Sequence, residues 1–137
     1  MSKLLDQLKR HEGYRKFPYS DSVGLLTVGI GRNLEHVGIS EEEADILLAN
    51  DVEVARQAAS TMDYYESLSD ERKDAVVNLI FNMGLSRFLG FKKMNAALYI
   101  GDYELAAVEL LDSKYAVQVG DRARELASQI KTGEYAD

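Results

Sequence analysis

One stretch, from Leu8 to Leu34, interrupts a chain whose sequence is otherwise typical of helices. It reads LKRHEGYRKFPYSDSVGLLTVGIGRNL and holds the only proline and four of the ten glycines. Its aromatic and β-branched residues, divided by a polar turn at Ser20–Ser22, predict an antiparallel pair of strands. Glycines at alternate positions of a strand mark a bulge or a close approach of backbone or ligand. This break in the helical pattern is where we expect a functional site.

Helices are predicted on both sides of this stretch. Leucines at helical spacing in residues 3–12 predict a short amphipathic helix that Gly13 ends. Ser40 and Glu43 have the spacing of a capping box, in which the two residues exchange hydrogen bonds at a helix start. They predict a long helix over about residues 40–60.

More helices are predicted towards the C-terminus. A start signal at Ser69 or Asp70 opens a helix that Gly84 ends, and its apolar stripe is broad enough to predict burial on most sides. The stripe consists of Ala75, Val76, Leu79, Ile80 and Met83. The segment FLGFKKMNAALYIG should then run to Gly101. For the last two helices the predicted N-caps are Asp102 and Asp121, and the predicted C-terminal stop is Gly133.

Composition limits the chemistry available to the chain. Its 137 residues fit one domain with a core of its own. It has no cysteine, so disulfides and thiolate metal sites are excluded, and its two histidines do not form an HExxH pair. No metal and no cofactor is expected, although composition by itself excludes only these two kinds of metal site.

Charge narrows the choice of partner. The net charge of −7 is the sum of +2 over residues 1–40, −8 over 41–80 and −1 over 81–137. Sequence-independent DNA binding needs a basic footprint, so we expect no nucleic-acid partner. The first ten residues are interrupted by charges, and no apolar run is long enough to span a bilayer. These features predict a protein made in the cytoplasm without membrane insertion.

Three oxygen-bearing side chains stand close together in the Leu8–Leu34 stretch, at Glu12, Asp21 and Thr27. Each alone has an ordinary structural role, as a solvated helix end, a turn residue and a strand residue. Together, two carboxylates on facing elements provide what cleavage of a glycosidic bond requires. One donates a proton to the leaving oxygen, and the other stays ionised to position water or stabilise positive charge. Spacing alone leaves both interpretations open.

The motif Glu-x8-Asp-x5-Thr, with the Gly-Ile-Gly that follows it, resembles the signature of phage-type (T-even) lysozymes, glycoside hydrolase family 24. Three further segments are similar to the family's interlobe helix, buried central helix and C-terminal helix, in the family's order. They read ISEEEADILLANDV, AVVNLIFNMG and DRARELASQIKTGEY. The resemblance thus covers almost the whole chain.

This resemblance implies an α+β, lysozyme-like fold in a single domain, residues 1–137. A small antiparallel β lobe would cover about 14–39, and the interlobe helix about 40–60. The larger helical lobe would comprise about 61–137 together with the N-terminal helix 3–12, with a cleft between the lobes.

The resemblance also implies an endolysin, a muramidase that hydrolyses the β-1,4 bond between N-acetylmuramic acid and N-acetylglucosamine of peptidoglycan with inversion. Glu12 would be the general acid, and Asp21 and Thr27 would position the attacking water. The supporting residues implied are Arg122 near the glutamate, Gly29, Gly31, Arg32 and Asp51, and the substrate-binding residues implied are Leu34, Phe81 and Asn82. The enzyme would be a monomer that leaves the host cytoplasm through a separate pore-forming holin to act on glycan strands.

Two features depart from the family pattern. Where the family often has a histidine after Gly-Ile-Gly, this chain has Arg32, which predicts an ion pair with Asp51 whose cationic partner does not titrate. Only Asn33–Ile39 separates Arg32 from Ser40, so the β lobe should be shorter than in the T-even enzyme.

Two alternatives from other classes stay open at this point. One is a catalytically silent domain of the same fold that binds peptidoglycan or a protein partner. The other is an acidic helical adaptor, which predicts no β lobe at all.

Overall fold

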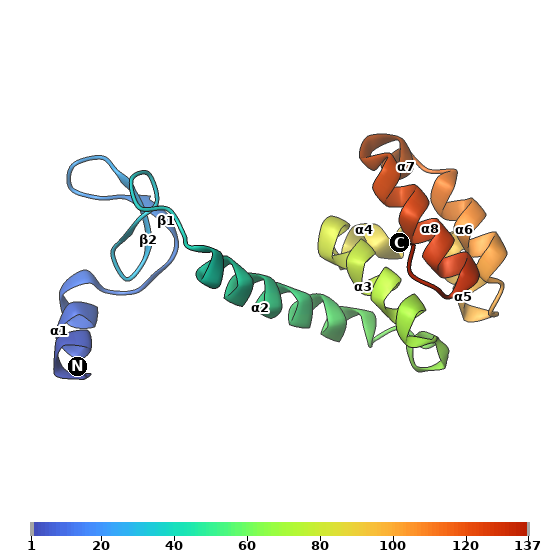
Figure 1. Ribbon diagram of the computed structural model, residues 1–137, viewed down its shortest axis with the longest axis horizontal. Coiled ribbons are helices and arrows are strands. Elements are labelled where there is room, and N and C mark those ends of the chain that lie inside the picture. Colours follow the sequence, from blue (N-terminus) through green and yellow to red (C-terminus); the bar gives the residue numbers. More distant parts are fainter. Residues whose placement is uncertain (1, 137) are drawn as a thin grey trace. The chain divides into compact units, whose positions relative to one another are not determined.

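The computed structural model describes residues 2–136, and these divide after Leu47 into two compact units. The described residues form eight α-helices, one 3-10 helix and one three-stranded antiparallel sheet (Figure 1). The predicted α+β class is therefore confirmed, and the all-helical adaptor is wrong. The grouping of all residues into one domain, with the N-terminal helix in the helical lobe, stays a prediction.

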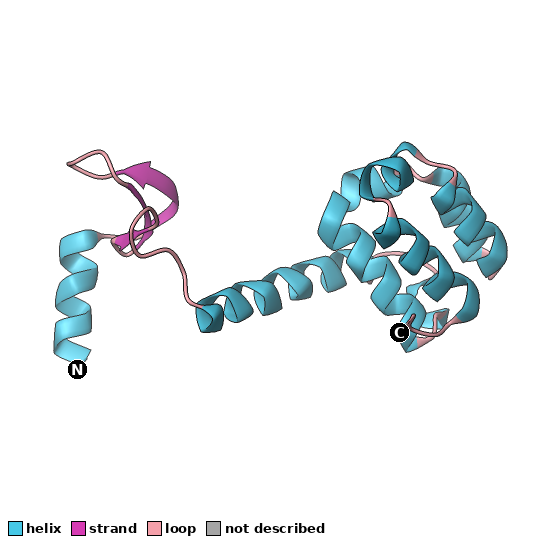
Figure 2. Cartoon of the chain, turned by 45° about the horizontal axis from the view of Figure 1, so that its top comes forward, coloured by secondary structure: helices cyan, strands magenta, loops and turns pink. Residues whose placement is uncertain are grey.

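The N-terminal unit consists of one helix, a small sheet and the start of a second helix. Its elements are α1 (Ser2–Glu12), β1 (Arg15–Ser20), β2 (Leu26–Gly29), β3 (Arg32–Asn33) and the first turns of α2 (Glu41–Ala59). The strands, magenta in Figure 2, have the order β1-β2-β3. Gly13 ends α1 as predicted, since its φ is +71° and its amide donates to the Lys9 carbonyl at 2.9 Å.

Register places Thr27 in the middle of the sheet. On the central strand β2 it lies opposite Tyr19 of β1 and Asn33 of β3. The pairing of β1 shifts between Arg15 and Tyr19, and this segment contains Pro18. Because proline has no backbone N–H to give to the ladder, it is tolerated at such an irregularity.

The predicted capping box opens α2. The Ser40 hydroxyl accepts the Glu43 amide at 3.1 Å, and the Glu43 carboxylate accepts the Ser40 amide at 2.9 Å. Two amides at the helix start thereby gain partners that the helix itself does not supply. The direction in which the chain enters α2 is fixed by this exchange.

The C-terminal unit contains the rest of α2 and a bundle of short helices. They are η1 (Tyr65–Ser67), α3 (Asp70–Met83), α4 (Leu85–Leu89), α5 (Lys92–Tyr99), α6 (Tyr103–Leu111), α7 (Lys114–Val119) and α8 (Asp121–Thr132). Ser69 and Asp102 cap α3 and α6 as predicted, each accepting a backbone amide three residues ahead. Across residues 2–136 no helix combines the length and the apolar character that crossing a membrane requires.

Three expectations for this unit need correction. The segment predicted to run to Gly101 is broken at Gly90, where α4 has ended and α5 has not begun. Helix α7 was not predicted; it is short, and the Ser113 hydroxyl caps it by accepting the Ala116 amide at 3.1 Å. Asp121 is the first residue of α8 rather than its cap, because Gly120 takes the cap position.

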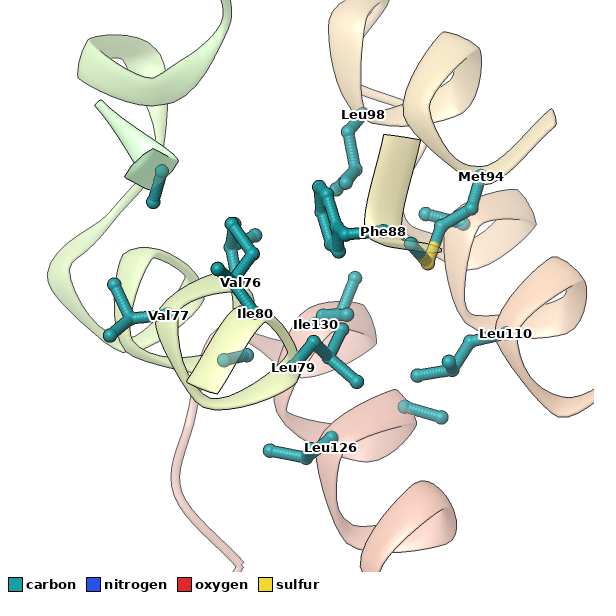
Figure 3. Packing of buried hydrophobic residues seen from close by; sticks show 14 of the residues in the cluster. Val76, Val77, Leu79, Ile80, Phe88, Met94, Leu98, Leu110, Leu126 and Ile130 are labelled. Carbon is teal, nitrogen blue, oxygen red and sulfur yellow. The ribbon is translucent and has the colours of Figure 1, made fainter. Parts of the chain in front are cut away.

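The core of the C-terminal unit lies among α3, α5, α6 and α8 (Figure 3). Four residues of the predicted α3 stripe are buried, whereas Met83 is only partly so. The largest aliphatic side chains that pack around them are Met94, Leu98, Leu110, Leu126 and Ile130. Burying an aliphatic side chain of this size stabilises a fold by roughly 1.5–3 kcal/mol.

A second set of contacts joins the start of α3 to the end of α8. Arg72 donates from Nε to the Ile130 carbonyl at 2.7 Å and from Nη2 to the Lys131 carbonyl at 3.0 Å. Its guanidinium carbon also lies 3.8 Å from the ring centroid of Tyr103. Carbonyls that α8 leaves unpaired at its C-terminus thus receive donors from another helix. Gly133 then ends α8 in the left-handed conformation, as predicted.

Candidate active site

Glu12, the last residue of α1, lies against the backbone of Gly31. A Cβ atom placed on Gly31 would stand 2.8 Å from both Cδ and Oε2 of Glu12. Only a glycine leaves room for this contact, and its φ of +72° favours glycine as well. The close approach expected from the alternating glycines is thus the approach of the Glu12 carboxyl group. Gly29 differs, because its φ is +70° but no atom lies within 4 Å of its Cβ position.

Asp21 organises the loop that joins β1 to β2. Its Oδ1 accepts the amides of Val23 at 3.0 Å and Leu25 at 2.9 Å, which makes the residue an Asx turn. Within residues 2–136, Oδ2 has no hydrogen-bond partner. One oxygen therefore holds the loop in place while the other is available to a ligand or to water.

Thr27 is linked to Asp21 through the backbone of Leu25. The Thr27 hydroxyl donates to the Leu25 carbonyl at 3.0 Å, and the Asp21 amide donates to the same oxygen at 2.9 Å. Thr27 itself is only 4% exposed, the one buried polar residue of the N-terminal unit among those described. Asp21 and Thr27 thus form one rigid corner of the hairpin.

The two carboxylates lie at opposite ends of β2. The Asp21 carboxylate is hydrogen-bonded to the Leu25 amide just before the strand, and the Glu12 carboxyl group lies beside Gly31, which follows the strand. Four extended residues span about 10 Å from the first Cα to the last. The unit thus presents two separated carboxylates with a hydroxyl between their attachment points. The structure brings together four predicted site residues in this unit: Glu12, Asp21, Thr27 and Gly31.

Arg32 has a different partner from the one predicted. Its guanidinium binds both carboxylate oxygens of Glu43, with Nη1 at 2.7 Å from Oε1, and Nη1 also donates to the Gly38 carbonyl at 3.0 Å. Glu43, and not Asp51, is thus the carboxylate that Arg32 contacts within the N-terminal unit, and the expected pair with Asp51, which belongs to the other unit, stays a prediction. The short loop after β3 brings Arg32 to the first turn of α2, whereas Asp51 lies two turns further along that helix.

The pair with Arg32, together with the Ser40 amide, lowers the pKa of Glu43 to about 2 from an ordinary value of 4.5. A lowered folded-state pKa contributes stability that is complete above the unfolded-state value and is lost as pH falls through the folded one. We therefore expect Glu43→Gln to lower the melting temperature at pH 6, with the difference from wild type shrinking from pH 4.5 down to 2. Thermal unfolding followed by circular dichroism checks this. A difference that is constant across the range would contradict it.

Other predicted residues lie in the C-terminal unit. Arg122, in the first turn of α8, donates from Nε and Nη2 to Oδ1 of Asn78 on α3, at 3.2 and 2.7 Å. Its placement beside Glu12 stays a prediction. Asp51 and the partly exposed Phe81 line one groove of about 350 Å³, whose remaining wall is formed by Val54, Ala55, Ala58, Ile80, Gly84 and Leu85.

The two remaining candidates carry less information. Asn82 is exposed at the end of α3. Leu34 is half-buried and follows β3 directly, and its amide donates to the Leu26 carbonyl at 2.9 Å. Their predicted contact with substrate stays a prediction.

Sequence reasoning missed Leu25 and Glu43 as parts of this arrangement. Leu25 acts only through its peptide groups, which leave no residue-type signal. Glu43 did carry a signal as a member of the capping box. Its second role is possible because Oε2, which the capping box does not use, is free to bind Arg32, and because the short Asn33–Ile39 loop brings Arg32 within reach.

Phage lysozymes and endolysins are among the known proteins to which this chain is similar in sequence. The sequence pattern of the phage lysozyme family matches residues 9–130. A probable T4-type lysozyme of Dictyostelium discoideum is 28% identical, covering 97% of this chain and 96% of its own length. The endolysin of Salmonella phage P22 is 33% identical over 75% of each chain. That of Acyrthosiphon pisum secondary endosymbiont phage 1 is 30% identical over 84% of this chain and 80% of its own.

A small sheet flanked by two separated carboxylates, taken with the match to the phage lysozyme pattern, identifies a glycoside hydrolase of the lysozyme class. The pattern match covers most of the chain, and the positions of Glu12, Asp21 and Thr27 fall within the matched range. The chain belongs to the phage lysozyme family.

Proposed function

We propose that this lysozyme is an endolysin that hydrolyses the β-1,4 bond between N-acetylmuramic acid and N-acetylglucosamine in bacterial peptidoglycan. The observation that carries the proposal is the arrangement around β2, where one carboxyl group rests on Gly31 and another has a single oxygen bound to the hairpin. The carboxyl groups of Glu12 and Asp21 thus have different surroundings, and the proposed mechanism gives them different roles, as proton donor and as acceptor for the attacking water.

Glu12 is the general acid. Its carboxyl group donates a proton to the glycosidic oxygen as the bond to the anomeric carbon breaks. Contact with Gly31 limits where the carboxyl group can point, which matters because proton transfer depends on the orientation of the donor. Glu12 is otherwise exposed, so a glycan has access to it.

Asp21 and Thr27 position the water. Oδ2 of Asp21 accepts a proton of the water that attacks the anomeric carbon from the face opposite the leaving group. The Thr27 hydroxyl, whose own proton goes to the Leu25 carbonyl, offers its oxygen as a second acceptor. A water between two separated carboxylates is the arrangement of an inverting glycosidase, so inversion of configuration is the proposed outcome.

Gly31 provides a direct check on the acid. We expect Gly31→Ala to lower turnover by about 10²-fold, because the new methyl group would displace the carboxyl group of Glu12. Gly29→Ala is the matched control, with the same positive φ but no neighbour to displace. Rates of lysis and melting temperatures of both variants are the measurement. Equal losses of activity would mean that backbone strain, and not the Glu12 contact, is responsible.

Arg122 is proposed to orient the carboxyl group of Glu12. A cation there also favours the ionised carboxylate, which opposes proton donation. We expect orientation to dominate, so Arg122→Ala should lower activity at every pH. Asn78→Ala, which removes the acceptor of Arg122 but keeps the cation, should cause a smaller loss. A pH–rate profile with an undiminished maximum that is merely displaced would contradict this role.

A turbidity assay tests the proposed function. Purified protein is added to bacteria whose outer membrane has been permeabilised, and the released sugars are reduced with borohydride to identify the new end. An endolysin of this kind clears the suspension and leaves reducible N-acetylmuramic acid. A silent wall-binding domain, the alternative, would sediment with the cells and leave the turbidity unchanged.

The remaining parts of the proposal concern the enzyme's setting. Glycan strands are the substrate, and a separate holin would provide the route to the wall. The active species would be the monomer, since the proposed acid and water-positioning residues all belong to one N-terminal unit.

A further inference from the structure

The backbone beside Glu12 belongs to a very short strand. β3 consists of Arg32 and Asn33 alone, and these two residues pair with Val28 and Thr27 of β2. Two paired residues hold a strand weakly. Gly31, which precedes β3 and contacts the Glu12 carboxyl group, therefore needs a further anchor to keep its place.

Arg32 supplies that anchor. Its side chain reaches the Gly38 carbonyl and both carboxylate oxygens of Glu43. Two parallel hydrogen bonds between a planar guanidinium and a carboxylate fix direction as well as distance. The residue next to Gly31 is thus bound to the first turn of α2.

Glu43 is itself held firmly. Its Oε1 accepts the Ser40 amide at 2.9 Å, and its own amide donates to the Ser40 hydroxyl at 3.1 Å. The helix that carries it runs for 19 residues from Glu41 to Ala59. A rigid element therefore lies at one end of a chain of contacts, and the Glu12 carboxyl group lies at the other.

We propose that Glu43 is a positioning residue for the proton donor: through Arg32 it fixes the backbone of Gly31, against which the carboxyl group of Glu12 lies. The proposal rests on the proposed function, because that function makes Glu12 the donor. The hydrogen bonds of the Glu43 side chain among the described residues are to Arg32 and Ser40, and none is to Glu12, so its effect on the donor is indirect. Its removal should slow the chemical step and leave substrate binding unchanged.

The test measures kcat and KM separately on soluble peptidoglycan fragments at a temperature where all proteins are folded. Glu43→Gln keeps Oε1 for the Ser40 amide but loses the second oxygen that binds Arg32. We expect kcat to fall by about tenfold, since a small misplacement of a catalytic group is costly, with KM unchanged within twofold. Arg32→Lys, which keeps the charge but lacks the planar fork, should lower kcat in the same way.

Ser40→Ala is the matched control. It removes the hydroxyl from the capping box while leaving the Arg32–Glu43 pair and the Ser40 amide intact. It should lower the melting temperature of the protein and preserve kcat. A fall in kcat equal to that of Glu43→Gln would show that Glu43 acts only by stabilising the start of α2, and would overturn the inference.

A double variant tests the route of the effect. If Glu43 acts through Arg32, Glu43→Gln should cost less than twofold in kcat when Arg32→Gln is already present. Full additivity would overturn the inference. If the wild type is active and Glu43→Gln has the same kcat, this inference is overturned while the proposed function stands. A wild type that hydrolyses no fragment would overturn the proposed function, and this inference with it.

Discussion

Glu12→Gln is expected to abolish lysis while leaving the fold intact. The amide has nearly the shape of the carboxyl group and fits the same place against Gly31, but it has no acidic proton for the leaving oxygen. General acid catalysis contributes roughly 10²–10⁴-fold to rate, and we expect a loss in that range. The measurement is the initial rate of turbidity loss, with circular dichroism to establish that the variant is folded.

Glu35 provides a matched control for this substitution. It is an exposed glutamate of the same unit whose Oε1 accepts the Leu26 amide at 2.9 Å, and glutamine preserves that acceptor. Glu35→Gln changes the charge by the same amount and should keep the wild-type rate. A Glu12→Gln protein that retained more than about a tenth of the wild-type turnover would show that Glu12 is not the acid.

Asp21→Asn is expected to remove most of the activity with little change in melting temperature. Asparagine offers the same Oδ1 to the amides of Val23 and Leu25, so the Asx turn survives. Its amide nitrogen replaces Oδ2 and cannot accept a proton from the attacking water. The expected loss is about 10²-fold or more, measured as the rate of lysis.

Asp21→Ala separates the two roles of this residue. Alanine lacks the acceptor for both amides, so this variant should lose activity as Asp21→Asn does and also lose stability. A strongly destabilised Asp21→Asn protein with normal specific activity would mean instead that Asp21 is a turn residue alone.

Signals confined to a few neighbouring residues predicted structure well in this chain. The exchange between Ser40 and Glu43, the caps at Ser69 and Asp102 and the stop at Gly133 all involve partners within four residues. Capping hydrogen bonds of this kind can be predicted from residue type, because helix geometry fixes the distance between the cap residue and the backbone group it binds. The alternating glycines Gly29 and Gly31 likewise predicted a close approach, which at Gly31 is that of the Glu12 carboxyl group.

Predictions failed where the path of the chain decides the partner. The contact of Arg32 with Glu43 was not predicted, and it forms because the loop after β3 is short enough to bring Glu43 within reach. Asp121 has the residue type of an N-cap, yet Gly120 adopts a positive φ of 59° and takes that position. Helix α7, only six residues long, has too few turns for an apolar period to stand out.

The candidate site likewise contains parts that the sequence predicts and one part that it does not. Glu12, Asp21 and Thr27 were recognisable because their chemistry depends on side-chain type and on a spacing that the hairpin preserves. The Leu25 backbone, which joins Asp21 to Thr27, has no such mark, because any residue supplies a carbonyl and almost any supplies an amide.

The junction of α3 with α8 bears on how the C-terminal unit is made on the ribosome. Arg72 and the residue before it emerge early, but their hydrogen-bond partners Ile130, Lys131 and Gln129 are synthesised almost sixty residues later. Leu126 and Ile130, two side chains that complete the core, arrive equally late. Contacts so distant in sequence close a long loop only once both ends exist. The parts of α3 and α6 that pack against α8 can therefore be buried only after the last helix of the unit has been synthesised.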